Sequence, residues 1–174
     1  MPVPDTTSAE AIELYPAGKK VAGGEGPAWR EVRVSILAMP RETGVFTMPA
    51  TAEPMIVLVL RGEAEAQERE NGGPWLRNRL HAGSLYITAA GAPYDFQVRT
   101  LGDEPFEVMN VLLSLPLFGE ALADVFGVNA EFARLRDVSG FEDVALVALL
   151  QRLREELARP VASALYVRGI GQAL

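Results

Sequence analysis

The chain has 174 residues, 49% of them apolar, which suffices for one domain with a buried core. Its net charge is −7 and no lysine follows Lys20, so the sequence offers no basic face for gripping DNA phosphates. It contains no cysteine, which excludes disulfides, thiolate metal sites and cysteine nucleophiles. Neither an apolar run of membrane-spanning length nor a signal peptide is present, so we expect a cytoplasmic protein without a membrane partner.

The N-terminal part of the chain is predicted to be irregular. Prolines, threonines and a serine dominate residues 1–11, and residues 15–28 hold four glycines and two prolines. We therefore expect residues 1–28 to form a leader and a loop.

Short strands are predicted to follow. Residues 31–39 alternate polar and apolar, with Val32, Val34 and Ile36 on one face, and residues 55–60 form the continuous apolar run typical of a strand buried on both faces. Residues 40–54 are expected to be a turn-rich crossing. Further strands are predicted at 63–70, 75–80, 84–88, 94–99 and 105–114, with turns at 71–74 and 89–93. This spacing predicts a β-sandwich or small barrel over residues 29–114.

The apolar period becomes helical after residue 114. Ser114 is a predicted N-cap, with Pro116 in the first turn and Gly127 at the end of this helix. Ser139 and Glu142 have capping-box spacing for a second helix that runs to about Ala158. A third helix is predicted from about residue 162 to the last residue. Residues 115–174 are therefore expected to be helices that pack on the barrel, which gives an α+β, mainly β, fold.

Three segments, read together, resemble the cupin domain of AraC-family transcription regulators. They are LVLRG at 58–62, RENGGPW at 69–75 and AGSLYITAAG at 82–91, and the pattern after Phe141 is similar to the helical pair that follows the barrel in one bacterial branch of that family. The likeness covers about residues 12–174. It implies a cupin-type antiparallel β-barrel, or jelly roll, with a C-terminal helical segment. It also implies that the domain senses a small organic effector, forms a homodimer and is not an enzyme.

Regulators of this family bind DNA through a C-terminal helix-turn-helix region. The sequence stops where that region would follow, and we find no basic helix pair within it. We therefore expect DNA contact only through a region absent from this chain. The alternative is a free-standing metal-free cupin, either structural or enzymatic.

Metal-binding cupins are similar to one another in two histidine-containing motifs, and both lack histidine here. The stretch 62–75 contains four glutamates but no histidine, and in Gly83-x5-Ala89-x-Gly91-x2-Tyr94 the tyrosine stands where the second motif has its ligand. Because such sites depend on imidazole, we expect neither metal nor other cofactor. His81, the only histidine, is interpreted as a turn residue and not as a general base, so no catalytic residue is predicted.

Two sets of side chains are candidates for binding. Glu68 shares strand parity with Ala64 and Ala66, so it points into the barrel or, being near the strand end, reaches water. Arg77 and Arg79 share a face with Trp75 that is expected to be solvated, with the binding of an anionic effector as the alternative. The ligand-binding candidates are Glu68, Trp75, Tyr86, Tyr94, Phe96 and Phe106, with plain core packing as the alternative for the aromatic rings. The dimer-contact candidates are Leu146, Leu150, Leu153 and Leu157, which otherwise pack internally.

Overall fold

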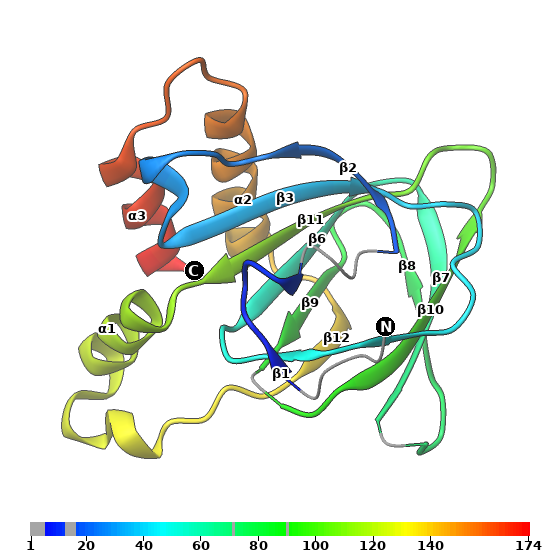
Figure 1. Ribbon diagram of the computed structural model, residues 1–174, viewed down its shortest axis with the longest axis horizontal. Helices are drawn as coiled ribbons and strands as arrows, with labels where there is room; N and C mark the ends of the chain where they lie inside the picture. Colours follow the sequence, from blue (N-terminus) through cyan, green and yellow to red (C-terminus); the bar gives the residue numbers. More distant parts are fainter. Residues whose placement is uncertain (1–5, 13–16, 71, 90) are drawn as a thin grey trace.

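Two facing antiparallel sheets form a barrel, and the helices gather on one side of it (Figure 1). The computed structural model describes residues 6–12, 17–70, 72–89 and 91–174. The remaining parts of the predicted leader, first loop, hairpin and turn lie outside the described residues. Within the described ranges, none of the helices combines the length and apolar content needed to cross a bilayer. The predicted class, a cupin-type β-barrel with a C-terminal helical segment, is confirmed.

The larger sheet has the strand order β12-β9-β6-β11-β3-β2. Its central strands are the long apolar runs of the sequence, because this sheet is covered on both faces. Its members are β2 (Lys19–Gly23), β3 (Val32–Ala38), β6 (Met55–Arg61), β9 (Leu85–Thr88), β11 (Glu107–Leu113) and β12 (Val138–Phe141).

The smaller sheet has the order β4-β10-β7-β8, and in β7 Ala64 and Ala66 alternate with more exposed neighbours. A separate two-residue parallel pairing joins β1 (Thr6–Thr7) to β5 (Ala50–Thr51). The members of the smaller sheet are β4 (Phe46–Met48), β7 (Glu63–Glu70), β8 (Leu76–Leu80) and β10 (Tyr94–Leu101).

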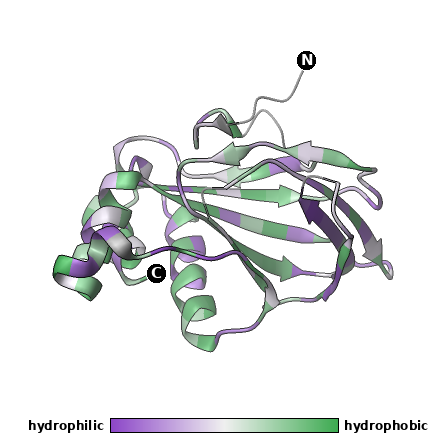
Figure 2. Ribbon diagram, turned by 90° about the horizontal axis from the view of Figure 1, so that it is seen from below, coloured by the Kyte–Doolittle hydropathy of each residue, from purple (hydrophilic) through white to green (hydrophobic). Residues whose placement is uncertain are grey.

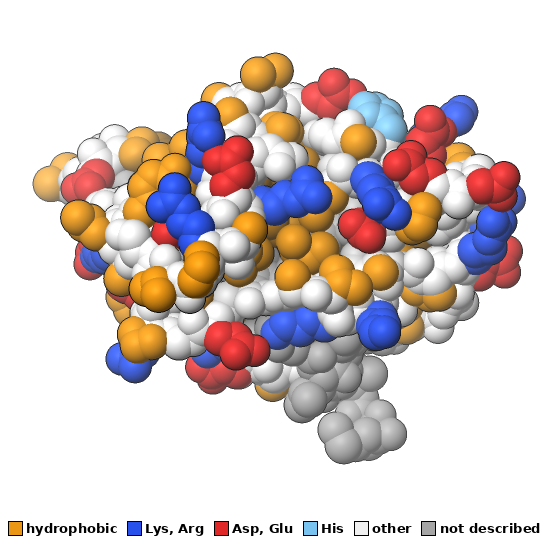
Figure 3. All heavy atoms as spheres, turned by 90° about the horizontal axis from the view of Figure 1, so that it is seen from above, with side chains coloured by type: hydrophobic (Ala, Val, Ile, Leu, Met, Phe, Trp, Pro, Cys, Tyr) orange, Lys and Arg blue, Asp and Glu red, His pale blue; other side chains and the backbone are white. Residues whose placement is uncertain are grey.

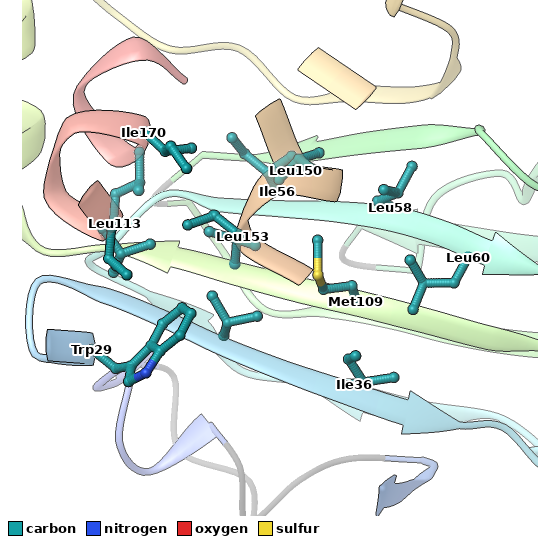
Figure 4. Close-up of a cluster of buried hydrophobic side chains, with 14 of the residues drawn as sticks. Trp29, Ile36, Ile56, Leu58, Leu60, Met109, Leu113, Leu150, Leu153 and Ile170 are labelled. Atoms are coloured by element: carbon teal, nitrogen blue, oxygen red, sulfur yellow. The ribbon is translucent and has the colours of Figure 1, made fainter. Parts of the chain in front are cut away.

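The main apolar core lies between the larger sheet and the helices. In β6, Ile56, Leu58 and Leu60 face the helices, whereas Val57 and Val59 face the barrel interior. Figure 4 shows Ile56 beside Leu150 of the helical segment, and Figure 2 shows apolar residues along the strands beside the helices. The predicted face of Val32, Val34 and Ile36 also belongs to this core. Alternation within one strand thus supplies two separate cores.

Three α-helices follow the strands. Ser114 caps α1 (Leu115–Phe126) by accepting from the Leu117 N–H, and Gly127 ends it, as predicted. A 3₁₀ segment at Gly127–Phe132 continues the chain towards β12. The predicted cap Ser139 is wrong, because Ser139 lies in β12 and pairs with Tyr86, and the Asp143 carboxylate caps α2 (Val144–Leu157). Ser163 caps α3 (Ala164–Ala173).

Two predicted loops contain strands. β2 lies within residues 15–28, a 3₁₀ turn at Pro27–Trp29 begins there, and β4 and β5 lie within residues 40–54. β12 similarly interrupts the segment predicted to be wholly helical. β2, β4 and β12 lie at sheet edges, where backbone pairing to one neighbour does not require an apolar alternation. Periodicity therefore did not reveal them.

A buried carboxylate joins α2 to α3. Glu156 is 1% exposed, its Oε1 accepts from the Ser163 N–H at 2.7 Å, and its Oε2 lies 3.2 Å from Arg159 Nε. The close approach of α3 to the barrel has a second requirement. A Cβ on Gly171 would lie 2.4 Å from Cγ2 of Val32. These contacts hold the helical pair against the larger sheet.

Candidate functional site

A cavity of about 80 Å³ lies inside the barrel, between the two sheets. Its wall is mainly apolar, as is typical of small-molecule sites, and a few polar groups interrupt it. The residues that line it are Leu37, Met39, Phe46, Met48, Met55, Val57, Val59, Glu68, Leu80, Tyr86, Thr88, Tyr94, Phe96, Val98, Phe106, Val108 and Asn110.

Strand alternation brings Glu68 into this wall. Ala64 and Ala66 of β7 are buried in the interior cluster, and Glu68 follows them at the same parity. Its partner in β10 is Phe96, which lines the same cavity. Glu68 is half-buried, so the structure combines the two positions considered for it, in the barrel wall and near the open end of the strand.

The Glu68 carboxylate is held by the segment that precedes α2. Its Oε1 accepts a short hydrogen bond from the Ser139 hydroxyl of β12. Burial raises the pKa of Glu68, and this hydrogen bond opposes the rise only in part. The protonated carboxyl is therefore favoured more strongly in the folded protein than in the unfolded chain.

This raised pKa predicts how Glu68→Gln should change stability with pH. The stability gained from the protonated carboxyl is present below the ordinary pKa and is lost as pH rises through the raised one. Glutamine does not titrate and its oxygen can still accept from Ser139. We therefore expect the unfolding free energy of Glu68→Gln, relative to the original protein, to increase from pH 4 to pH 7 in urea titrations. Glu131→Gln, at an exposed position, is the control, and a flat difference for Glu68→Gln would contradict the prediction.

Tyr86 of β9 places a buried hydroxyl at the cavity. The residue is 8% exposed, and its hydroxyl has no hydrogen-bond partner among the described residues. Asn78 lies close enough to influence this hydroxyl, yet the two groups make no hydrogen bond of normal geometry. Burial, with a smaller contribution from Glu68, raises the pKa of Tyr86, so the hydroxyl stays protonated at neutral pH. Buried hydroxyls in proteins are usually satisfied, which makes this one a candidate ligand contact.

Tyr94, Phe96 and Phe46 form an aromatic group on the smaller sheet. The Phe46 and Phe96 rings meet edge to face with centroids 5.7 Å apart, and Tyr94 meets Phe96 similarly at 6.3 Å. Burial raises the pKa of Tyr94 to about 12. All three rings line the cavity, and Tyr94 does so from the position that carries histidine in metal-binding cupins.

A larger, open pocket of about 630 Å³ adjoins the cavity. Glu68, Thr88 and Tyr94 line both spaces and so form the boundary between them. Arg77, which was expected to be solvated, lines this outer pocket together with Ser139. A small molecule could reach the barrel interior from this side by passing the three boundary residues.

Of the two remaining ligand-binding candidates, Phe106 lines the cavity and Trp75 does not. Phe106 is 1% exposed and lines the cavity while packing in the interior cluster. Trp75 is not among the residues that line the cavity, so ligand contact by Trp75 stays a prediction. Its ring instead lies under the Arg69 guanidinium, 4.5 Å from the ring centroid, and β8 begins only at the following residue. Alternation along β8 therefore does not extend to Trp75.

His81 lines neither space. It is exposed, and its Nε2 lies 3.1 Å from Glu142 Oε1, a carboxylate contact that the sequence did not predict. An exposed pair of this kind contributes little to stability.

Acidic and basic side chains are interspersed over the face shown in Figure 3.

The four leucines predicted at the dimer contact lie on the side of α2 that meets the chain's own core. Leu150 and Leu153 are fully buried there and present no surface to a second copy. Leu146 and Leu157 are half-buried and pack against the same cluster. Internal packing therefore accounts for Leu150 and Leu153, and a dimer contact stays a prediction for the two outer leucines.

The polar residues at the cavity or the outer pocket that were not ligand-binding candidates include Thr88, Asn110 and Ser139. Thr88 follows Tyr86 by two positions in β9, so parity could have identified it. Asn110 is a polar residue inside the apolar run of β11, which is itself a signal. No local pattern indicated the contact of Ser139 with Glu68, because the two residues are 71 positions apart in the sequence. In the part of the chain that the structure describes, no three His, Cys, Asp or Glu side chains gather as a metal site would require.

The architecture defined above is a cupin-type barrel with an internal, mainly apolar cavity. No family model and no curated protein sequence matches the chain. Among solved structures, ToxT from Vibrio cholerae is similar with a TM-score of 0.57 and 12% identity, over 83% of this chain and 54% of that one. ToxT bound to (E)-4-(8-methylnaphthalen-1-yl)but-3-enoic acid gives a TM-score of 0.59 at 10% identity, over 83% of this chain and 55% of the other.

The AraC-like transcriptional activator CuxR is also similar, with a TM-score of 0.50 and 12% identity over 87% of this chain and 53% of CuxR. At these identities the likeness shows the fold. At that level it confirms the resemblance inferred from the sequence motifs. The chain spans about half the length of each of these proteins.

Proposed function

We propose that this chain is a small-molecule-sensing and dimerisation domain of a cytoplasmic AraC-type transcription regulator, and that it has no enzymatic activity. The observation that carries the proposal is the apolar barrel cavity on which the polar groups of Glu68, Tyr86 and Tyr94 converge. Largely apolar cavities with a few placed polar groups are typical of small-molecule sites. The likeness to CuxR supports a regulatory role, in which DNA contact belongs to a helix-turn-helix region joined to this domain.

The cavity wall is suited to admitting a molecule larger than the empty space. Met39, Met48 and Met55 all line it, and methionine side chains adapt readily because they are unbranched and flexible. The adjoining outer pocket offers an entry route past Thr88 and Tyr94. A bound effector would therefore be largely enclosed by the barrel.

A path from the cavity to the helices begins at Glu68. The carboxylate holds Ser139, and four residues further along the chain Asp143 caps α2. An effector bound to Glu68 would change how the carboxylate holds Ser139 of β12 and so alter how α2 is held. In this proposal α2, with Leu146 and Leu157 at the edges of its packed face, carries the response to the second copy.

The proposal is tested by a thermal-shift screen of small metabolites. A true effector should raise the unfolding midpoint of the original protein with increasing concentration. Val57→Phe, which places a ring in the cavity, should abolish the shift, whereas Val21→Phe on the exposed edge strand should retain it. A complete screen without a hit, or a shift that persists in a folded Val57→Phe variant, would count against the barrel as sensor. Sedimentation velocity on the same samples measures whether two copies associate.

A further inference from the structure

We propose that the effector of this cavity is a small amine, with a compact apolar body in the barrel and an ammonium head at Glu68 and Tyr86. The inference rests on the proposed sensing function and adds the chemical class of the ligand. Three independent features of the wall support it: the sign of its charge, its unsatisfied hydroxyl and its size.

The charge of the wall selects against anions. Glu68 is the only acidic residue that lines the cavity, and no Lys, Arg or His lines it among the described residues. A carboxylate or phosphate ligand would lose its hydration without gaining a cationic partner, and it would lie beside a like charge. An ammonium ion instead converts the buried Glu68 carboxylate into one half of an ion pair.

The hydrogen-bonding groups of the wall can be satisfied by an ammonium group. Within the described chain only Oε1 of Glu68 accepts a bond, from Ser139, so Oε2 can accept from a ligand. The Tyr86 hydroxyl is buried without a partner and can accept as well. An ammonium group carries three N–H donors and can satisfy both oxygens together. A neutral hydroxyl could donate to Glu68 and accept from Tyr86, but it carries no charge to pair with the carboxylate.

The size and the rings of the cavity define the apolar body. The cavity of about 80 Å³ is smaller than the roughly 150 Å³ that accepts benzene, so a ligand enters only as the flexible methionines of the wall adjust, and its apolar body must be compact. Tyr94, Phe96 and Phe46 form part of the wall, and aromatic faces attract cations. A branched aliphatic amine meets both conditions.

The test uses three probes with the same carbon skeleton: 3-methylbutylamine, 3-methylbutan-1-ol and 3-methylbutanoate. Each is titrated into the full chain at pH 7, and affinity is measured from the NMR shifts of the methionine methyl groups. We expect the amine to bind at least about tenfold more tightly than the alcohol, because it gains charge-assisted hydrogen bonds. The carboxylate should bind more weakly than either.

Variants assign the preference to particular groups. Glu68→Gln should reduce the affinity for the amine to about that for the alcohol, and Tyr86→Phe should weaken the amine by several-fold. Glu131→Gln, at an exposed position, should change neither value. Because the probe series on the original protein is informative alone, the inference stays testable even if a variant fails to fold.

The outcomes separate this inference from the proposed function. If the alcohol or the carboxylate binds as tightly as the amine, the amine class is overturned and the sensing function stands. The amine class is likewise overturned if Glu68→Gln keeps the full preference for the amine. If none of the three probes shifts the methionine signals at millimolar concentration, the amine class is overturned, and the thermal-shift screen decides the sensing function separately.

Discussion

Replacement of Gly62 by alanine should lower the unfolding free energy by about 3 kcal/mol, from backbone strain and a steric clash together. Gly62 joins β6 to β7 at a φ of +79°, a conformation that L-residues with a side chain rarely adopt. An alanine Cβ there would lie 2.6 Å from the Pro105 carbonyl oxygen and 3.0 Å from the Phe106 Cα. Both are backbone atoms, and Phe106 is itself 1% exposed, so the neighbouring chain cannot easily give way.

Gly102→Ala is the matched control for this substitution. Gly102 has a φ of +72°, and nothing lies within 4 Å of the position its Cβ would take. Its loss should be only the strain of the backbone conformation, about 1 kcal/mol. Urea denaturation of both variants measures the difference. Equal losses would show that the close approach of Gly62 to Pro105 contributes nothing to stability.

Leu153→Ala should lower the unfolding free energy by about 3 kcal/mol, because it removes a fully buried side chain and leaves a void. Leu153 lies between α2 and the larger sheet, close to Leu150 and Ile56 (Figure 4). Leu165→Ala is the control, since Leu165 is 84% exposed on α3 and its truncation should change stability by no more than about 0.5 kcal/mol.

The same pair distinguishes core packing from a dimer seam. A leucine in a seam between two copies would affect self-association, and its truncation would make apparent stability depend on protein concentration. We expect the loss in Leu153→Ala to be independent of concentration. A loss that vanishes on dilution, accompanied by dissociation in sedimentation velocity, would return Leu153 to the interface that the sequence predicts for it.

Sequence reasoning identified the strands that bury side chains. The runs that became β3, β6 and β11 are apolar because they lie between two cores, and this pattern is visible in the sequence itself. The edge strands β2, β4 and β12 depend on backbone pairing with a neighbour, which no local pattern records. Ser139 is an example of this missing information. Its spacing to Glu142 suggested a helix cap, whereas in the structure it pairs with β9.

Part of the candidate site could be predicted from the sequence, because side chains alternate between the two faces of a regular strand. Glu68 was placed by parity with Ala64 and Ala66, and parity holds wherever a strand is regular. Parity failed for Trp75, which precedes β8 and packs on Arg69. The unpartnered hydroxyl of Tyr86 and the enclosed space beside it depend on how two sheets fit together, and the order of residues along one strand does not contain that information.

The positions of the basic residues have a consequence for solubility. Lys19 and Lys20, the only lysines of this acidic chain, are both exposed on β2, the edge strand of the larger sheet. Arg77 and Arg79 are exposed on β8, an edge strand of the smaller sheet. Charges on edge strands keep unpaired backbone groups from recruiting another chain. The lysines of β2 and the arginines of β8 are therefore expected to disfavour edge-to-edge aggregation.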